Sequence, residues 1–384
     1  MRKTILSTLA LALFATASAQ DTIKIGAITS ITGRFAEFGK MQLAGFKVGV
    51  AEVNRKGGVL GKKIELVIED NASDVNKGLA AAERLNNAGV PLVLNEYSSS
   101  LVKAQALYFT RQKVPNLVFT SSGDDITRPG NDYTYRMNQP ATEYARAILN
   151  IFRDNKFKTI AIIGGTGAFE KSVSDAAVNF AKAYGIQILE DQRYDQGLTD
   201  FRPVLNRIKA KNPDGVLMVS YAADSVTLMR QAREVGVKPK LFAGGAAGFA
   251  LPDFIKDSGS AAEHVVTATA WISQLRYPGA QKLNVDLKKA LGGADPSYHA
   301  AQAYAAVLVA AKAIQAAGSA DREKVKAALN GVNMMTAFGQ VSFKDFDGFR
   351  NQSPLTMVAQ QVQGGKFVPV YPASVVPKKI LMER

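Results

Sequence analysis

Residues 91–101, PLVLNEYSSSL, place three consecutive serines shortly after a run of apolar side chains. A similar pattern returns in PNLVFTSSGDD, residues 115–125, where two serines follow an apolar run. A short apolar run that ends in polar, turn-forming residues is typical of a buried β-strand. The two stretches therefore predict strands of a covered sheet, each ending in a hydroxyl-rich loop.

The rest of the chain alternates strand-like apolar runs with amphipathic stretches. Further strands are predicted at residues 23–29, 64–70, 159–165, 186–194, 215–221, 240–245 and 264–271, and helices at residues 36–54, 77–87, 101–112, 142–153, 172–184, 201–211, 225–235 and 298–317. Residues 355–372 predict a hairpin that turns at Gly364-Gly365. Apolar runs separated by helices indicate parallel sheets covered on both faces. The predicted fold class is therefore α/β, with two Rossmann-like lobes built on doubly wound parallel sheets.

The two serine loops are candidates for a binding site. In an open parallel sheet, ligands bind beyond the carboxyl ends of the strands, where both serine clusters are expected. Hydroxyls, together with unpaired N–H groups at the start of the following segment, suit an anion such as a carboxylate. The alternative is that the serines only cap helices. Their recurrence in adjacent loops favours the anion site.

The beginning of the chain has the pattern of a secretory signal peptide. Arg2 and Lys3 precede an apolar stretch at residues 5–15, and Ala17-Ser18-Ala19 fits a cleavage site, so residues 1–19 are predicted to be removed. A lone membrane anchor is the alternative, but the apolar stretch is short for a bilayer. No later segment is expected to span a membrane. The mature protein is therefore expected to be soluble, and periplasmic or secreted.

The composition narrows the chemistry further. The 384 residues include no cysteine, which excludes disulfides, thiolate metal sites and the thiol that bacterial lipid anchoring needs. The formal net charge is +14, but the Lys and Arg residues are spread along the chain. That distribution favours a solvated basic surface over long-range attraction of anionic ligands or membranes. No nucleic-acid partner is expected, because a localised basic patch with aromatic side chains is not evident.

Several stretches together resemble the periplasmic substrate-binding proteins of branched-chain amino acid ABC transporters, the Leu/Ile/Val-binding group. The resemblance rests on IKIGAITSITGRFAEFG (23–39), AEVNRKGGVLGKKIELVIEDNASD (51–74), YSSSLVKAQ (97–105), FTSSGDDITRPG (119–130) and SYAADSVTLMRQAREVGVK (220–238). Their order and spacing are specific, and they extend over nearly the whole mature chain. The family resemblance implies a type I periplasmic-binding-protein fold that traps a small ligand between its lobes and presents it to an ABC permease. It implies no enzymatic activity and no cofactor, and a monomer is expected.

The resemblance also implies domain boundaries. It places three hinge crossings near Asn138–Ala141, Thr269–Ser273 and Gln352–Leu355. Lobe one would comprise residues 21–139 plus 272–352, and lobe two residues 140–271 plus 353–384.

The family's site residues fall on identifiable positions of this chain. Ser98, Ser121 and Ser122 match positions that hold the carboxylate of the ligand through hydroxyl and backbone N–H groups. Four aromatic residues fall on or beside positions that line the pocket: Phe38, Tyr97, Phe169 and Tyr221. For these four, plain core packing is the alternative interpretation.

One departure from the family pattern bears on the ligand. Amino-acid binders place an acidic residue in the second lobe to hold the ligand ammonium, but the matching position here is close to Gly245 or Ala246. Asp224 and Glu96 are nearby candidates, but neither is predicted to replace it. Phe38 and Phe169 stand where tyrosine is frequent. The resulting hypothesis is a hydrophobic carboxylate, aromatic or short-chain aliphatic, with a branched-chain amino acid close behind. The family's cysteine pair is replaced by Ser73 and Tyr97.

Other function classes find less support in the sequence. Gly165-x-Gly167 followed by Glu190 resembles a dinucleotide-binding loop, but Glu170 stands where the third glycine belongs. His264 and His299 share no metal-ligand spacing, so neither a metal site nor a catalytic residue is predicted. Asp124-Asp125 is expected to cap a loop. A sensor ectodomain of the same fold is the remaining alternative, but it would need a transmembrane helix after the domain and none is predicted, so a free binding protein is favoured. Such a protein could still deliver its ligand to a separate sensor.

Overall fold

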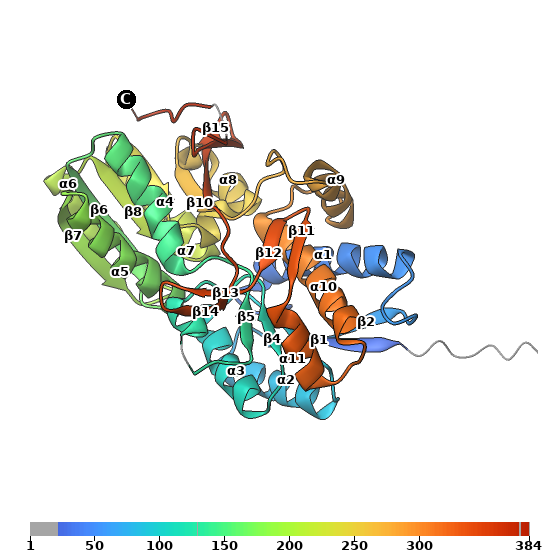
Figure 1. Cartoon of the computed structure of the whole chain (residues 1–384). Helices are drawn as coiled ribbons and strands as arrows, with labels where there is room; N and C mark the ends of the chain where they lie inside the picture. The colour runs from blue at the N-terminus through green and yellow to red at the C-terminus, as the bar shows by residue number, and fades with distance from the viewer. Residues whose placement is uncertain (1–21, 129, 376–377, 384) are drawn as a thin grey trace, which may run out of the picture.

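Two seven-stranded sheets organise the protein, each within its own lobe (Figure 1). The computed structural model describes residues 22–128, 130–375 and 378–383. The predicted signal peptide at residues 1–19 lies outside these residues. The first sheet has the strand order β13-β14-β5-β4-β3-β1-β2 and the second has the order β16-β15-β10-β9-β8-β6-β7.

The first sheet is parallel except at one edge, where β13 runs antiparallel to β14. Its strands are β1 (Ile23–Thr29), β2 (Ile64–Asp70), β3 (Val93–Asn95), β4 (Asn116–Val118), β5 (Thr134–Arg136), β13 (Lys344–Phe346) and β14 (Phe349–Gln352). Its lobe also contains α1 (Ala36–Arg55), α2 (Val75–Asn87), α3 (Ser99–Arg111), the single turn η1 (Asp124–Thr127), α9 (Ala280–Ala290), α10 (Tyr298–Ala317) and α11 (Arg322–Asn330). A small antiparallel pair, β11 (Asn333–Thr336) and β12 (Gly339–Ser342), follows α11.

The second sheet has a parallel body and an antiparallel hairpin at one edge. Its strands are β6 (Thr159–Gly165), β7 (Gln187–Tyr194), β8 (Gly215–Val219), β9 (Leu241–Gly244), β10 (Val266–Thr269), β15 (Val358–Gln363) and β16 (Lys366–Tyr371). Around it lie α4 (Ala141–Asp154), α5 (Ala168–Ala183), α6 (Arg202–Lys211), α7 (Ala222–Val235), α8 (Pro252–Ser258) and the short turns η2 (Ala247–Ala250) and η3 (Gly259–Ala262). The β15–β16 hairpin is the one predicted to turn at Gly364-Gly365.

The chain passes between the lobes three times. It leaves the first sheet after β5 and enters the second lobe at α4, returns between β10 and α9, and passes again between β14 and β15. The predicted α/β class, with two doubly wound lobes joined by three crossings, is confirmed. The sequence prediction omitted several elements, among them β5, β13, β14, α9 and α11.

Helices α1 and α10 pack closely together in the first lobe (Figure 1). A Cβ added to Gly45 of α1 would lie 2.2 Å from the carbonyl oxygen of Ala300, and one added to Gly49 would lie 2.9 Å from Cβ of Val307. Glycine at these two positions therefore lets the helix backbones approach. Helix α10 is long and apolar enough to span a bilayer, so the expectation that no later segment would qualify was too strict. Most of α10 is nevertheless buried within the lobe.

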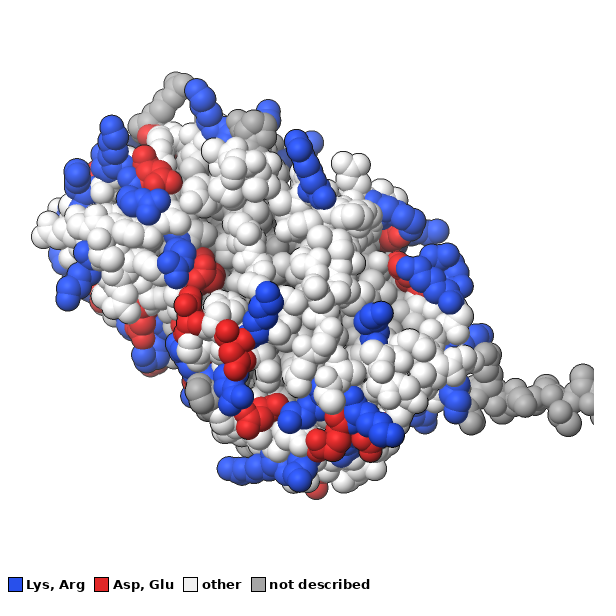
Figure 2. Space-filling model, in the orientation of Figure 1, with Lys and Arg blue, Asp and Glu red and all other residues white. Residues whose placement is uncertain are grey.

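Charge is dispersed over the face shown in Figure 2, where Lys and Arg residues are interspersed with Asp and Glu. Among the described residues, no group of three or more His, Asp or Glu side chains is placed to hold a metal ion.

Candidate functional site

The two serine loops adjoin at the carboxyl end of the first sheet. Strands β3 and β4 are parallel neighbours, with Asn95 paired to Val118 near the ends of both strands. The hydroxyls of Ser99 and Ser121 lie 2.9 Å apart, and Ser99 Oγ also accepts a hydrogen bond from the N–H of Gly123 at 2.9 Å. The loops thus meet as adjacent loops should. Their direct contact is made by Ser99, which was not among the predicted site residues.

The three predicted serines are all buried but differ in their partners. Ser121 donates its N–H to the carbonyl of Glu96 at 2.9 Å, and its hydroxyl forms a hydrogen bond with the hydroxyl of Ser99. Both of its polar groups therefore already have partners within the protein. By contrast, the N–H groups of Ser98 and Ser122 donate to no acceptor within the described part of the chain. Ser98 stands at the N-cap position of α3 without capping it through its side chain. Ser98 and Ser122 therefore offer backbone donors at a buried position.

The four predicted aromatic residues form one cluster across the two lobes. Phe38, in the first turn of α1, stacks on Tyr97 with ring centroids 3.7 Å apart. Tyr221 lies 5.4 Å from Tyr97 and 6.1 Å from Phe169, which belongs to α5 of the second lobe. Tyr221 precedes α7 instead of ending β8, which stops at Val219. These side chains join the lobes in one buried apolar cluster.

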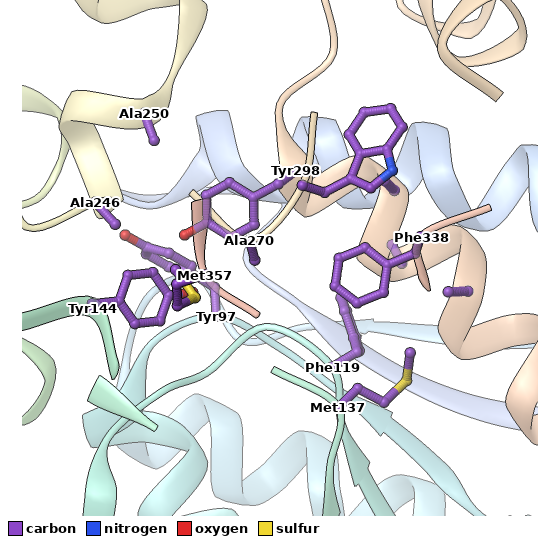
Figure 3. Packing of buried hydrophobic residues seen from close by; sticks show 14 of the residues in the cluster. Tyr97, Phe119, Met137, Tyr144, Ala246, Ala250, Ala270, Tyr298, Phe338 and Met357 are labelled. Atoms are coloured by element: carbon purple, nitrogen blue, oxygen red, sulfur yellow. The ribbon is translucent and has the colours of Figure 1, made fainter. Parts of the chain in front are cut away.

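Four further aromatic residues extend this cluster, and the sequence analysis assigned none of them to it. Phe35 lies 4.8 Å from Tyr221, Tyr144 lies 6.1 Å from Phe169, and His299 lies 5.1 Å from Phe38, as measured between ring centroids. Tyr298 lies 3.9 Å from His299. Figure 3 shows the side chains of Tyr97, Tyr144 and Tyr298 gathered near Ala246. Helix α4 places Tyr144 here and helix α10 places Tyr298 and His299, and no local sequence motif marks these three residues.

Burial governs the ionisation of the groups in this cluster. It raises the pKa of the Tyr97 and Tyr221 phenols well above 10, and a hydrogen bond with Ser98 partly opposes the shift at Tyr221. Burial lowers the pKa of His299 to about 3, so its imidazole is neutral. The hydroxyl of Tyr97 and Nε2 of His299 have no hydrogen-bond partner among the described residues. The cluster therefore contains neutral polar atoms with unused hydrogen-bonding capacity.

Tyr298 also lines a cavity of about 540 Å³. Trp271 and Tyr298 contribute aromatic rings to its lining, and Lys256, Lys366 and Asp295 contribute charged side chains. Trp271 is held by a hydrogen bond from its indole Nε1 to the carbonyl of Ala337 at 2.9 Å. Tyr298 thus belongs both to the lining of this cavity and to the aromatic cluster.

Polar contacts between the lobes surround the serine loops. Arg34 of the first lobe donates to the side-chain oxygen of Gln196 in the second. The N–H of Ala168 approaches Ser100 Oγ at 3.4 Å. Asp124 accepts hydrogen bonds from the N–H of Thr142 at 3.2 Å and from its hydroxyl at 2.5 Å, in the first turn of α4. The lobes therefore meet directly at this site.

Asn138, on the first crossing, connects the second serine loop with both lobes. Its Nδ2 donates to the carbonyl of Thr120 and to Ser122 Oγ, the latter at 3.0 Å. Its Oδ1 accepts from the hydroxyl of Tyr144 at 2.9 Å and from Nε2 of Gln302 at 2.8 Å. A movement of either lobe is therefore coupled to the position of Ser122.

A buried arginine lies behind the same loop. Arg136 donates from Nη1 to the carbonyl of Gly123 at 2.6 Å and from Nε to Oε1 of Gln352 at 2.5 Å. Burial lowers its pKa to about 10, which leaves the guanidinium charged at neutral pH. It links the loop to the third crossing, which begins after Gln352.

The two acidic residues near the expected ammonium site have other contacts. Glu96 is fully buried and accepts hydrogen bonds from Ser30 at 3.1 Å and from Asn71, so it joins the loops after β1, β2 and β3. Burial raises its pKa to about 7. Asp224 is half-buried, its nearest hydrogen-bond partner is the N–H of Gly197 at 3.5 Å, and burial raises its pKa.

The position expected to carry the family's acidic residue is closely packed. A Cβ added to Gly245 would lie 3.0 Å from Val219 and 3.1 Å from Val173. Ala246 has φ of 72° and ψ of −143°, a backbone conformation that residues with side chains rarely adopt. A longer acidic side chain does not fit here without rearrangement.

Glu170 lies where the sequence suggested an incomplete dinucleotide loop. Its carboxyl group fills the space above Gly165 and Gly167, since a Cβ added to either glycine would come within 2.8 Å of a carboxyl oxygen. A carboxyl group in the place of a phosphate disfavours a dinucleotide. Burial raises the pKa of Glu170 to about 7.

Known proteins resemble this chain in sequence. A family model described as periplasmic binding protein matches residues 22–366. The chain belongs to the periplasmic binding protein family. A Leu/Ile/Val-binding protein homolog 7 from Brucella suis is 29% identical to this periplasmic binding protein over 377 residues, covering 93% of each chain. A leucine-, isoleucine-, valine-, threonine- and alanine-binding protein of Pseudomonas aeruginosa is 27% identical over 348 residues, covering 89% of this chain and 91% of the relative.

Solved structures share the fold of this periplasmic binding protein. A Streptococcus pneumoniae branched-chain amino acid transporter substrate-binding protein, LivJ, in complex with isoleucine has a TM-score of 0.83 at 23% identity, and the match covers 92% of this chain and all of that one. A solute-binding protein from Rhodopseudomonas palustris in complex with benzoate has a TM-score of 0.81 at 17% identity, and the match covers 91% and 96%. These neighbours are solute-binding proteins, which are a class distinct from enzymes.

Proposed function

We propose that this protein captures a small hydrophobic carboxylate or a branched-chain amino acid between its two lobes and delivers it to an ABC importer. The observation that carries the proposal is the pair of free N–H groups at Ser98 and Ser122, buried beside an aromatic cluster to which both lobes contribute. The N–H groups suit a carboxylate, and the rings of Phe38, Tyr97, Phe169 and Tyr221 suit an apolar side chain.

The energetics are sufficient for a transport protein. A hydrogen bond to a charged group contributes roughly 1.5–3 kcal/mol, and a carboxylate buried without such partners is unfavourable. Two N–H donors with the hydroxyls of Ser98 and Ser122 support a Kd of about micromolar, on the order of −8 kcal/mol, after the loss of ligand and loop freedom. Ser121 would act mainly by holding the second loop in place.

The relatives support both ligand types. The Pseudomonas relative is named for aliphatic amino acids and threonine, whereas the solved neighbours include complexes with isoleucine and with benzoate. The aromatic cluster of this chain suits either type, because both combine a carboxylate with an apolar group.

The proposal includes the two lobes as moving parts. Lobe one comprises residues 21–139 plus 272–352, and lobe two comprises residues 140–271 plus 353–384. The distribution of the strands between the two sheets supports this division. The ligand docks first on the serine loops of lobe one, and lobe two closes over it by hinge motion, bringing Phe169 and Tyr221.

The remaining parts of the proposal concern location and partners. We expect a soluble monomer in the periplasm, released after cleavage of the signal peptide, with no lipid anchor and no catalytic activity. Its partner is an ABC permease in the inner membrane, which recognises the closed form.

The test is a binding measurement on the purified mature protein. Native mass spectrometry should reveal a co-purified small acid, and a thermal-shift screen should find stabilisation by leucine or by benzoate. Ser122→Ala should weaken binding of the stabilising acid by about tenfold, the loss expected for a hydrogen bond to a charged group. Ligand-free stability should fall by no more than about 1 kcal/mol, because Asn138 Nδ2 loses its bond to Ser122 Oγ but keeps the one to the carbonyl of Thr120. The exposed Ser260→Ala is the matched control. A large loss of ligand-free stability in Ser122→Ala would make that serine structural, and failure of every small acid to bind would refute the proposed function.

A further inference from the structure

Glu170 is a buried acidic residue with one carboxyl oxygen unused. It lies in the first turn of α5, directly after Phe169, and its side chain has no exposure to solvent. Its Oε1 accepts a hydrogen bond from Nε2 of Gln196 at 2.6 Å, while Oε2 has no partner among the described residues. A buried polar atom without a partner is unfavourable, and such atoms often belong to functional sites.

The surrounding loop accommodates this carboxyl group. A Cβ on Gly165 would lie 2.8 Å from Oε1, and one on Gly167 would lie 2.4 Å from Oε2. Two glycines therefore leave the space that the carboxyl occupies between β6 and α5. Gln196 fixes its orientation from the loop after β7.

The carboxyl also lies within electrostatic reach of both lobes. The charge of Glu170 contributes to raising the pKa of Tyr97 in the first lobe and of Tyr221 in the second. Arg34 of the first lobe binds Gln196, which in turn binds Glu170. Glu170 also directly follows Phe169, whose ring lies 6.1 Å from that of Tyr221, so it adjoins the aromatic cluster into which the ligand is proposed to dock.

Helix capping is the simpler role for a glutamate at this position. The third residue of a helix often reaches back to the first N–H groups, and the N–H of Glu170 itself contacts its carboxyl group. Capping does not require full burial, however, nor does it use Oε2. A ligand group would satisfy that oxygen.

We propose that Glu170 accepts a hydrogen bond from the ammonium group of the ligand, and so takes the place of the acidic residue that Gly245 and Ala246 cannot supply. The ligand class is then an amino acid, with its carboxylate on Ser98 and Ser122 of the first lobe and its ammonium on Glu170 of the second. This inference rests on the proposed function and narrows it from small hydrophobic acids to zwitterionic ones.

The experiment compares three acids that share one carbon skeleton. At C2, L-leucine carries an ammonium group, 2-hydroxy-4-methylpentanoate carries a hydroxyl, and 4-methylpentanoate carries only hydrogen. Calorimetric titration of the native protein should show leucine binding at least about tenfold more tightly than 4-methylpentanoate, because the charged hydrogen bond is made only with leucine. This ratio requires no variant.

A substitution then assigns the preference to Glu170. Glu170→Gln preserves the shape of the side chain but removes its charge. It should weaken leucine binding by about tenfold or more and change the affinity for 4-methylpentanoate by no more than about threefold. Glu143→Gln, which neutralises a partly buried carboxylate paired with Arg146 on α4, is the control and should change the affinity for neither acid. If Glu170→Gln does not fold, Gln196→Ala serves instead, because it releases the Glu170 carboxyl group from its fixed orientation. It should lower the affinity for leucine more than the affinity for 4-methylpentanoate.

The possible failures are distinguishable. If 4-methylpentanoate or benzoate binds as tightly as leucine, or if Glu170→Gln weakens all acids equally, the assignment of Glu170 is wrong and the proposed function stands. A preference for the 2-hydroxy acid over leucine would also overturn the ammonium assignment. If none of the four acids binds, the proposed function itself fails, and the assignment fails with it.

Discussion

The hydroxyl groups of Ser99 and Ser121 lie 2.9 Å apart and connect the two serine loops directly. The serines of the two loops therefore have two different roles. Ser99 and Ser121 hold the loops against each other, whereas Ser98 and Ser122 keep their N–H groups free. The loops are therefore fixed by one pair of serines and available for binding through the other.

Substitution of Ser99 should act on stability. In Ser99→Ala the N–H of Gly123 and the hydroxyl of Ser121 both lose a buried partner, which should lower the stability of the first lobe by about 1–3 kcal/mol. Chemical denaturation of the ligand-free protein measures the change. Ser260→Ala, at an exposed position, should be neutral. A Ser99→Ala protein that unfolds like the native one would show that the loops do not depend on this bond.

Asn138 should be the most sensitive polar residue of the crossings. Asn138→Ala removes its side-chain bonds to Thr120, Ser122, Tyr144 and Gln302, and leaves several buried groups unpaired. We expect a loss of about 2–4 kcal/mol in the free energy of unfolding, together with weaker ligand binding because Ser122 is no longer positioned. Asn179→Ala, on the exposed face of α5, is the control. Equal effects of the two substitutions would contradict the role given to Asn138.

Leucine binding should release a proton near neutral pH. Burial raises the pKa of Glu170 to about 7, while nearby Asp224 raises it and Arg34 lowers it, so the free protein is partly protonated at pH 7. A bound ammonium favours the ionised carboxylate and lowers this pKa. Leucine affinity should therefore fall as the pH drops below about 7, by up to about tenfold per pH unit.

Titration calorimetry in buffers of different ionisation enthalpy measures the proton directly. Release should occur with leucine, be absent in Glu170→Gln, and be absent with 4-methylpentanoate. Glu96 also has a pKa of about 7, so Glu96→Gln provides the comparison and should still release a proton. If proton release disappears in Glu96→Gln but persists in Glu170→Gln, the proton comes from Glu96 and the prediction for Glu170 is wrong.

The packing of α1 on α10 should tolerate no added methyl group at Gly45. A Cβ there would meet the backbone oxygen of Ala300 at 2.2 Å, so Gly45→Ala must push the helices apart and should destabilise the first lobe by about 1–3 kcal/mol or more. Gly331→Ala is the matched control, since its Cβ would approach no closer than 3.6 Å to Ala328 and its φ is −91°. Thermal unfolding distinguishes the two. Equal melting temperatures would mean that the helices are not in close contact.

Much of the fold could be predicted because its strands are long apolar runs. The bounds of β1, β2 and β6 agree with their predicted ranges, since each has seven residues and a clear end. Strand β5 was missed because it has only three residues and is identified by its neighbours in the sheet. Strands β13 and β14 were missed for the same reason, as their pairing with β5 joins distant parts of the chain.

The site was only partly predictable. The two loops could be found because hydroxyl clusters at strand ends have a local pattern. Tyr144, Tyr298 and His299 could not be found, because their helices reach the cluster only through the tertiary fold. In the sequence, Glu170 occupies the position of the third glycine of a dinucleotide-binding loop. In the structure, its carboxyl group lies in the space left by Gly165 and Gly167.

The order of strands in the two sheets has a consequence for biosynthesis. Strand β14 pairs with β5, and β15 pairs with β10, so each sheet incorporates strands made long after its other members. Neither lobe can finish folding until the ribosome has synthesised nearly the entire polypeptide. Slow, long-range pairing of this kind keeps a nascent chain open for longer. For a chain that is exported as proposed, such a delay would suit a translocation channel that accepts unfolded polypeptide.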